Sequence, residues 1–315
     1  MVRFTIMAVG LSGWLFGCTP SPPKGEDAPA ASTEGFLPSP ESFAEEYPTF
    51  DKYWYQGRAE LTRYALKQHR YGDTHDGDAV LVFVTEPFLP GLQVKQEHGD
   101  AKDSVSVLKL NAYRRFYTGI YPYTVMTSSF TPAHRAGAPT LKVTNTVQEW
   151  CGQTFTQVNR RASGLQLSSY SYKQDEGDRK LKLADAKLED GLWAQIRIDP
   201  TTIVEGEQEL VPGLDYLVMR HKALRAYPAI VKRTEGATTE LVAGTFDSVE
   251  IEYPPLGRTL TIFYEAEFPF AIVAWDESVG PQRTTAVRTN AIIDDYWNHA
   301  APGDVAYRES LGVEF

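Results

Sequence analysis

The sequence predicts a mainly β protein: a large antiparallel sheet, a sandwich or an open barrel-like body with a few short helices. Segments with alternating polar and apolar residues recur every ~8–20 residues, which is typical of antiparallel strands. No composition typical of a linker interrupts the chain after residue 40. The 315 residues are 42% hydrophobic, and this is enough apolar material to form a folded core.

The first predicted element is a short helix, and strands follow it. Ser39-Pro40-Glu41-Ser42 is typical of a helix start, with a serine cap before proline, and the helix is expected to end near Glu46. The next segments are predicted strands because their residues alternate in polarity or form β-branched runs. These strands are expected at residues 58–66, 79–85, 104–110, 121–130, 141–150, 154–158 and 165–172.

The second half contains one predicted internal helix. Leu188, Leu192 and Ile196 recur at helical spacing, so a helix is expected over residues 184–196, ended by Asp199-Pro200. The remaining elements return to the strand pattern, and the first two of them form a hairpin across a Pro-Pro-Leu-Gly turn. They are strands at 248–253, 259–264, 270–275 and 286–297 and a closing helix at 304–311.

The N-terminal residues resemble the signal of a bacterial lipoprotein. A basic start precedes the uncharged apolar run of residues 4–16, which is shorter than the ~20 residues of a membrane-spanning helix. Leu15-Phe16-Gly17-Cys18 resembles a lipobox, which implies cleavage before Cys18 and acylation of its thiol. The predicted organisation is therefore a signal peptide at 1–17, an acylated N-terminus and proline-rich tether at 18–40, and one β-rich domain at 41–315.

The predicted location is the cell envelope. Acyl chains on Cys18 would anchor the protein to a membrane, and Thr19 is not the aspartate that commonly retains such lipoproteins at the inner membrane, which favours the outer membrane. The formal net charge of −10 argues against nucleic acid as a partner, because binding phosphates needs a basic surface. Because anionic lipids repel an acidic protein, acyl chains rather than a basic patch must hold the protein at the membrane.

Several motifs resemble those of an uncharacterised bacterial envelope lipoprotein family. They include Tyr53-Trp54-Tyr55-Gln56-Gly57-Arg58, Gln148-Glu149-Trp150-Cys151-Gly152-Gln153 and Tyr253-Pro254-Pro255-Leu256-Gly257-Arg258. Some members of that family carry the label "septum formation inhibitor Maf", which implies a nucleotide pyrophosphatase. The chain lacks the Ser-x-Ser-Pro-Arg-Arg motif and the βαβ alternation that such enzymes share. The resemblance therefore supports a location and a fold and supplies no catalytic residues.

A nucleophilic site would have to use Cys151, activated by a histidine such as His221. The alternative is that Cys151 is a small buried hydrophobe on a strand, as free cysteines often are. The histidines show no metal-binding spacing, and the acidic segment at residues 73–78 is expected to be a solvated turn. No metal, no cofactor and no catalytic residue is predicted.

Aromatic side chains supply the candidate ligand-binding surface, because their rings combine stacking area with polar groups. The alternative is that they pack against neighbouring strands within the sheet. The candidates are Tyr53, Trp54, Tyr55, Tyr121, Tyr123 and Trp150. Three basic clusters are further candidates, for an anionic polysaccharide or headgroup, unless they are solvated strand edges. They are Arg114-Arg115, Arg160-Arg161 and Arg220-His221-Lys222.

Together these patterns favour a non-catalytic envelope lipoprotein that binds or scaffolds a glycan, an amphiphile or a protein partner. An envelope hydrolase with a cryptic site and a purely structural protein are the alternatives. A groove lined by aromatic side chains from distant segments would support binding. A cleft that unites Cys151, His221 and several acids would support hydrolysis.

Overall fold

The computed structural model describes residues 48–99 and 101–313, and these belong to one compact unit. The predicted signal peptide, Cys18, the tether and the helix expected at 39–46 lie outside the described residues. Among the helices of the described part, none is both long and apolar enough to cross a membrane.

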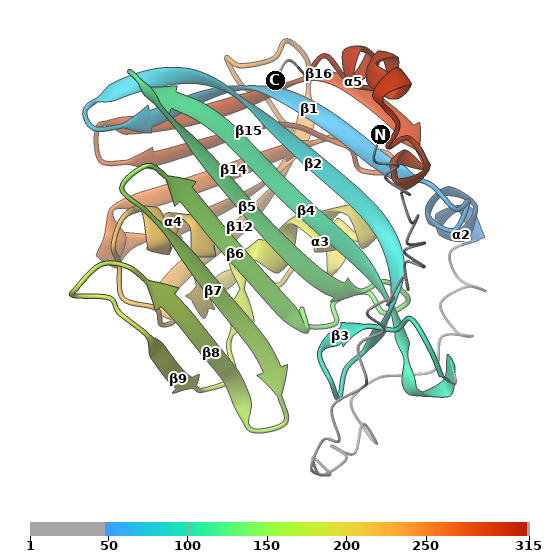
Figure 1. The fold of residues 1–315 in the computed structure, drawn as a ribbon, viewed down its shortest axis with the longest axis horizontal. Helices are drawn as coiled ribbons and strands as arrows, with labels where there is room; N and C mark the ends of the chain where they lie inside the picture. Colours follow the sequence, from blue (N-terminus) through green and yellow to red (C-terminus); the bar gives the residue numbers. More distant parts are fainter. Residues whose placement is uncertain (1–47, 100, 314–315) are drawn as a thin grey trace, which may run out of the picture. The chain divides into compact units, whose positions relative to one another are not determined.

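Sixteen strands form a single sheet, which confirms the predicted fold class (Figure 1). The strands of the first half are β1 (Ala59–Arg70), β2 (Asp73–Leu89), β3 (Val94–Lys95), β4 (Val105–Thr118), β5 (Tyr121–Pro132), β6 (Lys142–Glu149), β7 (Gly152–Arg161) and β8 (Gly164–Ser171). Those of the second half are β9 (Arg179–Leu183), β10 (Lys187–Leu188), β11 (Gly206–Val211), β12 (Tyr227–Ala237), β13 (Phe246–Tyr253), β14 (Arg258–Tyr264), β15 (Ile272–Val279) and β16 (Gln282–Asp294).

The helices are few and short. The α-helices are α2 (Pro48–Trp54), α3 (Glu189–Ile198), α4 (Leu214–Met219) and α5 (Val305–Leu311). Single 3-10 turns are η1 (Ala101–Asp103), η2 (Pro200–Thr202), η3 (Pro254–Leu256), η4 (Tyr296–Asn298) and η5 (Pro302–Asp304).

The strand order joins the two halves of the chain into one surface. It runs β10-β11-β12-β13-β14-β15-β16-β1-β2-β4-β5-β6-β7-β8-β9, with β3 added beside β2. Neighbouring strands are antiparallel except for the short β10–β11 pair. The predicted hairpin is β13–β14, in which Ile251 pairs with Leu260. The strands before α3 and those after it therefore belong to one sheet.

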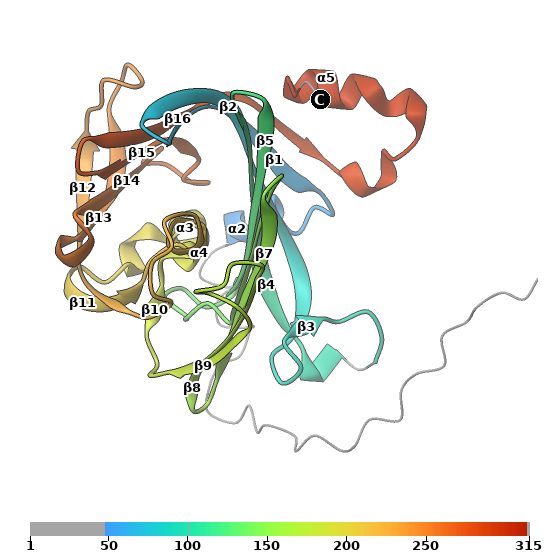
Figure 2. The same cartoon turned by 60° about the vertical axis from the view of Figure 1, so that its left-hand side comes forward.

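The sheet curves around α3 and α4, which lie against its concave face (Figure 2). Leu192, Trp193 and Ile196 of α3 are buried in the main hydrophobic cluster. The Trp193 ring meets the ring of Trp275 edge-on, with centroids 5.2 Å apart. The apolar side chains on the concave face need a second layer of structure to bury them, and the two helices supply that layer and complete the core.

Two local predictions need correction. The helix begins at Glu189 rather than at residue 184, and acids at its first turn suit the positive end of the helix dipole. Residues 73–78 are not a solvated turn but the first part of β2, because Asp76 and Asp78 form ion pairs with Lys67 and Arg63 on the neighbouring strand. The turn between β1 and β2 comes just before this segment, at Tyr71 and Gly72.

Antiparallel order places every second turn at the same end of the sheet. The turns after β1, β4, β6 and β15 lie at one end, together with the η3 turn and the connection from α4 to β12. We call this end the rim. Helix α2 lies at the opposite end, directly before β1 begins (Figure 1).

Candidate functional site

Three hollows meet at the rim around the turn between β6 and β7. The largest is an open groove of about 1000 Å³ along β5 to β8. A small pocket of about 30 Å³ lies between the turn and the end of α4, and a third hollow of about 380 Å³ lies beside the β8–β9 connection. Cys151 lines the first two and His221 lines the second and third. Segments far apart in the sequence therefore meet here.

We call the side chains around these hollows the rim site. Its residues are Arg70, Tyr71, Tyr121, Tyr123, Trp150, Cys151, Tyr172, Lys173 and His221. Three of the six aromatic residues that the sequence singled out are among them, and so are both residues of the candidate nucleophilic pair.

The aromatic side chains of the rim site form a continuous line. The Trp150 ring lies nearly parallel to the Tyr121 ring, with centroids 6.1 Å apart, and Tyr121 lies 5.8 Å from Tyr123. The hydroxyl groups of Tyr123 and Tyr71 are 2.6 Å apart. Trp150 is 68% exposed and Tyr172 is 84% exposed. Large rings this open to solvent offer area to a ligand that the fold itself does not use.

Two rim residues adopt an uncommon backbone conformation. Tyr71 and His221 have φ angles of 55° and 53°, in the left-handed region that bulky residues rarely enter. In the two-residue turn of Tyr71 and Gly72 both φ values are positive, as a type I′ hairpin turn requires. Strain of this kind is stored most often at functional sites. Here it places the Tyr71 side chain against Tyr123 and Arg70, which line the small pocket.

Cys151 is exposed in the β6–β7 turn, so the expectation of a buried cysteine on a strand is wrong. Its backbone N–H donates to Glu149 Oε2 at 2.6 Å, and a hydrogen bond with that carboxylate raises the pKa of the thiol. A raised thiol pKa lowers the fraction of thiolate, which is the reactive form. The environment of Cys151 therefore opposes nucleophilic attack.

His221 is held on both sides of its ring. Nδ1 lies 2.5 Å from Glu176 Oε1, and Nε2 lies 2.9 Å from Lys173 Nζ. The Glu176 carboxylate also accepts a hydrogen bond from the Ser171 hydroxyl at 2.7 Å. A histidine with both nitrogens engaged is not placed to take a proton from Cys151. The pair shares a pocket without forming a nucleophile and its base.

The other three aromatic candidates lie at the opposite end of the sheet. Trp54 is 2% exposed and belongs to the main core, and the Tyr53 hydroxyl donates to the buried Glu60. The Tyr55 ring stacks on His134 at 4.9 Å. These rings pack α2 against the body, and we leave them out of the candidate surface.

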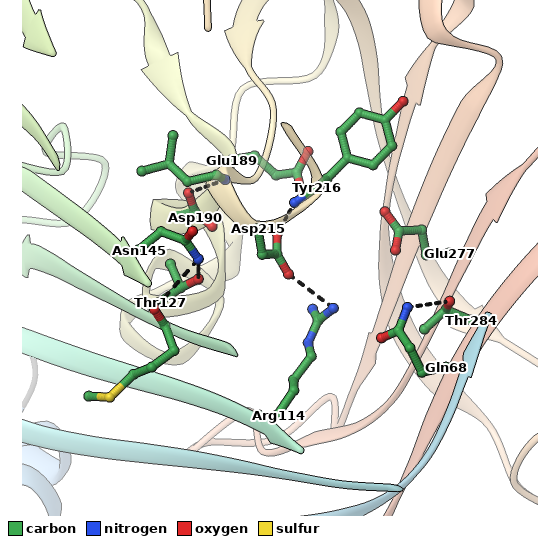
Figure 3. Close-up of polar contacts among 12 residues, drawn as sticks. Gln68, Arg114, Thr127, Asn145, Glu189, Asp190, Asp215, Tyr216, Glu277 and Thr284 are labelled. Atoms are coloured by element: carbon green, nitrogen blue, oxygen red, sulfur yellow. Dashed lines mark hydrogen bonds and ion pairs between the residues drawn. The ribbon is translucent and has the colours of Figure 1, made fainter. Parts of the chain in front are cut away.

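A buried polar cluster beneath the rim connects α3 and α4 to the sheet (Figure 3). Arg114 of β4 pairs with Asp215 of α4 at 3.0 Å, and Asp190 of α3 accepts a hydrogen bond from the Leu214 N–H at 3.0 Å. Arg258 joins the carboxylates of Glu189 and Glu277, at 2.7 Å and 2.6 Å. His221 follows two residues after α4, so this cluster fixes its position.

Asp190 is the unusual acid of this cluster. Burial raises its pKa well above the ordinary value, and the nearby carboxylates of Asp215 and Glu189 raise it further. Arg114 and Arg258 neutralise the other acids, which leaves Asp190 to keep its proton. The cluster surrounds a cavity of only about 30 Å³, which has room for roughly two water molecules. Its role is to hold the helices in place.

Among the described residues, one group of side chains has the spacing to hold a metal ion: Asp294, Asp295 and His299. Asp294 lies 2.8 Å from His299, and Asp295 accepts a hydrogen bond from the Asn298 amide at 2.7 Å. It lies at the end of β16, away from the rim.

Comparison with known proteins adds little to this geometry. No family model matches the chain, and no curated protein matches it in sequence. Its fold is similar to the crystal structure of a β-barrel-like protein of a domain of unknown function (DUF1849) from Brucella abortus, with 10% sequence identity and a TM-score of 0.46. The likeness covers 75% of this chain and 98% of that one. A likeness this distant carries no functional argument, and the lipoprotein-family resemblance stays a prediction.

Sequence reasoning missed four residues of the rim site: Arg70, Tyr71, Tyr172 and Lys173. Two of the three predicted basic clusters have acidic partners in the fold, since Arg114 pairs with Asp215 and Arg160 is buried against Asp185, whereas the third contributes His221 to the rim site. One signal was present for Tyr71, because a glycine after it separates two strand patterns and marks a turn.

Proposed function

We propose that this protein is a lipid-anchored protein of the bacterial cell envelope that binds a glycan at the rim site without chemically changing it. The observation that carries the proposal is the composition of the large groove. Exposed aromatic rings line it together with neutral hydroxyl and amide side chains, which four strands contribute, and with the carboxylates of Glu149 and Asp178. The neutral polar residues are Thr124, Thr146, Gln148, Gln153, Thr154 and Ser171.

This combination suits a sugar better than the other ligand classes. A sugar ring has an apolar C–H face, which packs on an aromatic ring, and an edge of hydroxyl groups that both donate and accept hydrogen bonds. Threonine, serine and glutamine side chains also donate and accept. An acyl chain would need a continuous apolar lining, whereas this groove mixes aromatic side chains with hydroxyl, amide and carboxylate groups. The groove volume of about 1000 Å³ is at the upper end of the range for small-ligand sites.

The state of Cys151 and His221 supports binding over hydrolysis. Their convergence in one pocket is the observation that keeps a hydrolase as the second candidate. The raised pKa of the thiol and the engagement of both imidazole nitrogens weigh against it. We therefore expect Cys151→Ser to leave glycan binding intact and the protein to release no product from bound sugar.

The envelope location rests on the lipobox at Cys18 and on the tether that follows it. The anchor would hold the body near envelope glycans, so that a modest affinity suffices through high local concentration. Mass spectrometry of the full chain, expressed in a Gram-negative host, tests this part. An acylated N-terminal peptide beginning at Cys18 is expected, and an intact unmodified leader would refute the anchor.

Calorimetric titration of the detergent-solubilised full chain tests the binding. The probes are tetrasaccharides of N-acetylglucosamine, of galacturonic acid, and of its methyl ester. We expect at least one to bind, and Trp150→Ala to weaken that binding about tenfold or more, as truncation of a central tryptophan does. Trp297→Ala is the matched control, because Trp297 is also exposed but lines none of the three rim hollows. Equal affinities of the two variants would refute the site.

A further inference from the structure

We propose that the small pocket of the rim site is a subsite for one acidic group of the glycan, a carboxylate or a phosphate, and that Arg70 binds it. The inference rests on the proposed function, because it names the class of glycan that the same site takes. It is carried by a cation that the fold places in a pocket and leaves without an acidic partner.

Arg70 donates only to uncharged oxygen atoms. Nη1 donates to the Met219 carbonyl at 2.6 Å, and Nη2 lies 3.4 Å from the Tyr123 hydroxyl and 3.5 Å from that of Tyr71. Its Nε is buried and has no hydrogen-bond partner. No carboxylate oxygen of the described residues lies within 4.0 Å of this guanidinium. The chain has 41 acids for 31 basic residues, so acidic partners are not scarce.

The guanidinium is held rigidly although it lacks a counter-ion. Its Cζ lies 4.5 Å from the centre of the Tyr71 ring and 5.3 Å from that of Tyr123. The Tyr123 ring in turn stacks on Phe116 at 4.9 Å. A partly buried charge without a partner costs free energy. A side chain that is already fixed loses less conformational entropy when a ligand binds to it. Arginine in such a fixed orientation is well suited to carboxylate and phosphate oxygens.

A second cation faces the same pocket. Lys173 Nζ contacts His221 Nε2 at 2.9 Å and, like Arg70, has no carboxylate oxygen of the described chain within 4.0 Å. The two acids nearby are already engaged, Glu176 by His221 and Ser171, and Glu149 by the Cys151 N–H. An incoming anion would therefore meet two cations that form no direct ion pair within the described residues, in a pocket that also contains the Glu149 carboxylate.

The size of the pocket selects a substituent rather than a sugar ring. About 30 Å³ holds roughly two water molecules, which matches the oxygens of one carboxylate or phosphate group. Seven residues line both this pocket and the large groove: Glu149, Cys151, Gly152, Gln153, Thr154, Ser171 and Tyr172. A sugar chain in the groove can thus place an acidic substituent over the turn and against Arg70.

The decisive experiment compares ligands that differ only in charge. Tetragalacturonate and its methyl ester share one backbone, and maltotetraose with and without a 6-phosphate separates phosphate from carboxylate. We expect the full chain to bind an acidic form about tenfold to a hundredfold more tightly than its neutral counterpart, as charged hydrogen bonds allow. Arg70→Gln should abolish this preference, so that the variant binds the acidic and the neutral form with equal affinity. Lys173→Gln should reduce the preference in part.

Arg225→Gln is the matched control, since Arg225 also lies over a tyrosine ring, at 3.9 Å from Tyr227, but lines none of the rim hollows. If circular dichroism shows that Arg70→Gln does not fold, Arg70→Lys replaces it in the comparison. That variant keeps the positive charge but loses the paired N–H donors of the guanidinium group. Equal affinity of the wild-type chain for acidic and neutral forms would overturn the subsite and leave glycan binding standing. Binding of none of these four sugars, nor of the N-acetylglucosamine tetrasaccharide, would overturn the proposed function itself.

Discussion

The ion pair between Arg197 and Glu60 offers the sharpest test of how the barrel-like body is held together. Arg197 of α3 is 1% exposed and donates two parallel hydrogen bonds to the Glu60 carboxylate of β1, at 2.5 Å and 2.6 Å. A third bond, at 2.8 Å, reaches the Pro269 carbonyl. The pair therefore joins the inner helix to the middle of the sheet. Its removal should loosen α3.

The size of the effect follows from burial. Arg197→Met leaves the Glu60 carboxylate buried without its cation, which typically costs ~3–5 kcal/mol. That is a large part of the ~5–15 kcal/mol by which domains are stable. Adding Glu60→Gln removes the stranded charge, so the double variant should be more stable than Arg197→Met alone by at least ~1 kcal/mol. Arg283→Met, whose ion pairs are exposed, should cost no more than ~1 kcal/mol.

The stability cost of Arg197→Met should also depend on pH, in a direction that the pKa of Glu60 predicts. Burial alone would raise the pKa of Glu60, but the charge of Arg197 and the hydrogen bonds from Arg197, Tyr53 and Thr62 together lower it. A carboxylate with a lowered folded-state pKa stabilises the fold fully above its unfolded value near 4.5, and that contribution is lost as the pH falls through the folded value. The gap between wild type and Arg197→Met should therefore be full at pH 7 and smaller in acid.

Urea unfolding followed by tryptophan fluorescence and circular dichroism measures these differences at pH 7 and pH 4. Two outcomes would refute the reasoning. One is a cost of Arg197→Met no greater than that of Arg283→Met. The other is a gap that stays constant, or widens, as the solution becomes acidic.

Three further predictions concern single residues. Because the pKa of Asp190 is raised in the folded state, the free energy of unfolding decreases as the pH rises above the pKa of this group in the unfolded state. Asp190→Asn should therefore be more stable than wild type in urea unfolding, by a larger margin at pH 8 than at pH 5. A Cβ on Gly77 would lie 2.3 Å from a backbone oxygen of β4, so Gly77→Ala should cost ~1–3 kcal/mol in thermal unfolding, whereas Gly91→Ala, with open space, should cost little. The Cys151 thiol should react slowly with a disulfide reagent at pH 7, and Glu149→Gln should accelerate it; equal rates would contradict the raised pKa.

Much of the fold follows from local patterns along the sequence. Alternation of polar and apolar residues located most of the strands but not β3 or β9 to β12, and the Pro-Pro-Leu-Gly turn located the β13–β14 hairpin. The closing helix begins at Val305, one residue from the predicted start. These features were predictable because a two-residue period and a tight turn depend only on neighbouring residues. The lipobox is equally local, and the location predicted from it awaits the mass spectrometry described above.

The candidate site was only half predictable, because the same residue types serve the core and the surface. Tyr53 and Trp54 resemble Tyr121 and Trp150 in composition, yet Trp54 is buried and Trp150 is exposed. Strand patterns assign a residue to one face of the sheet. They do not say which end of the sheet a helix will cover.

The sequence by itself determined the class of fold, the positions of most strands and turns, and the acidic character of the chain. Only the tertiary structure decided that β1, β5, the β6–β7 turn and the end of α4 meet at one rim. Only it showed that, among the residues that the structure describes, Arg70 has no acidic partner there. The physical reason is that strand order and sheet curvature depend on contacts between residues far apart in the chain, and no local period records those contacts.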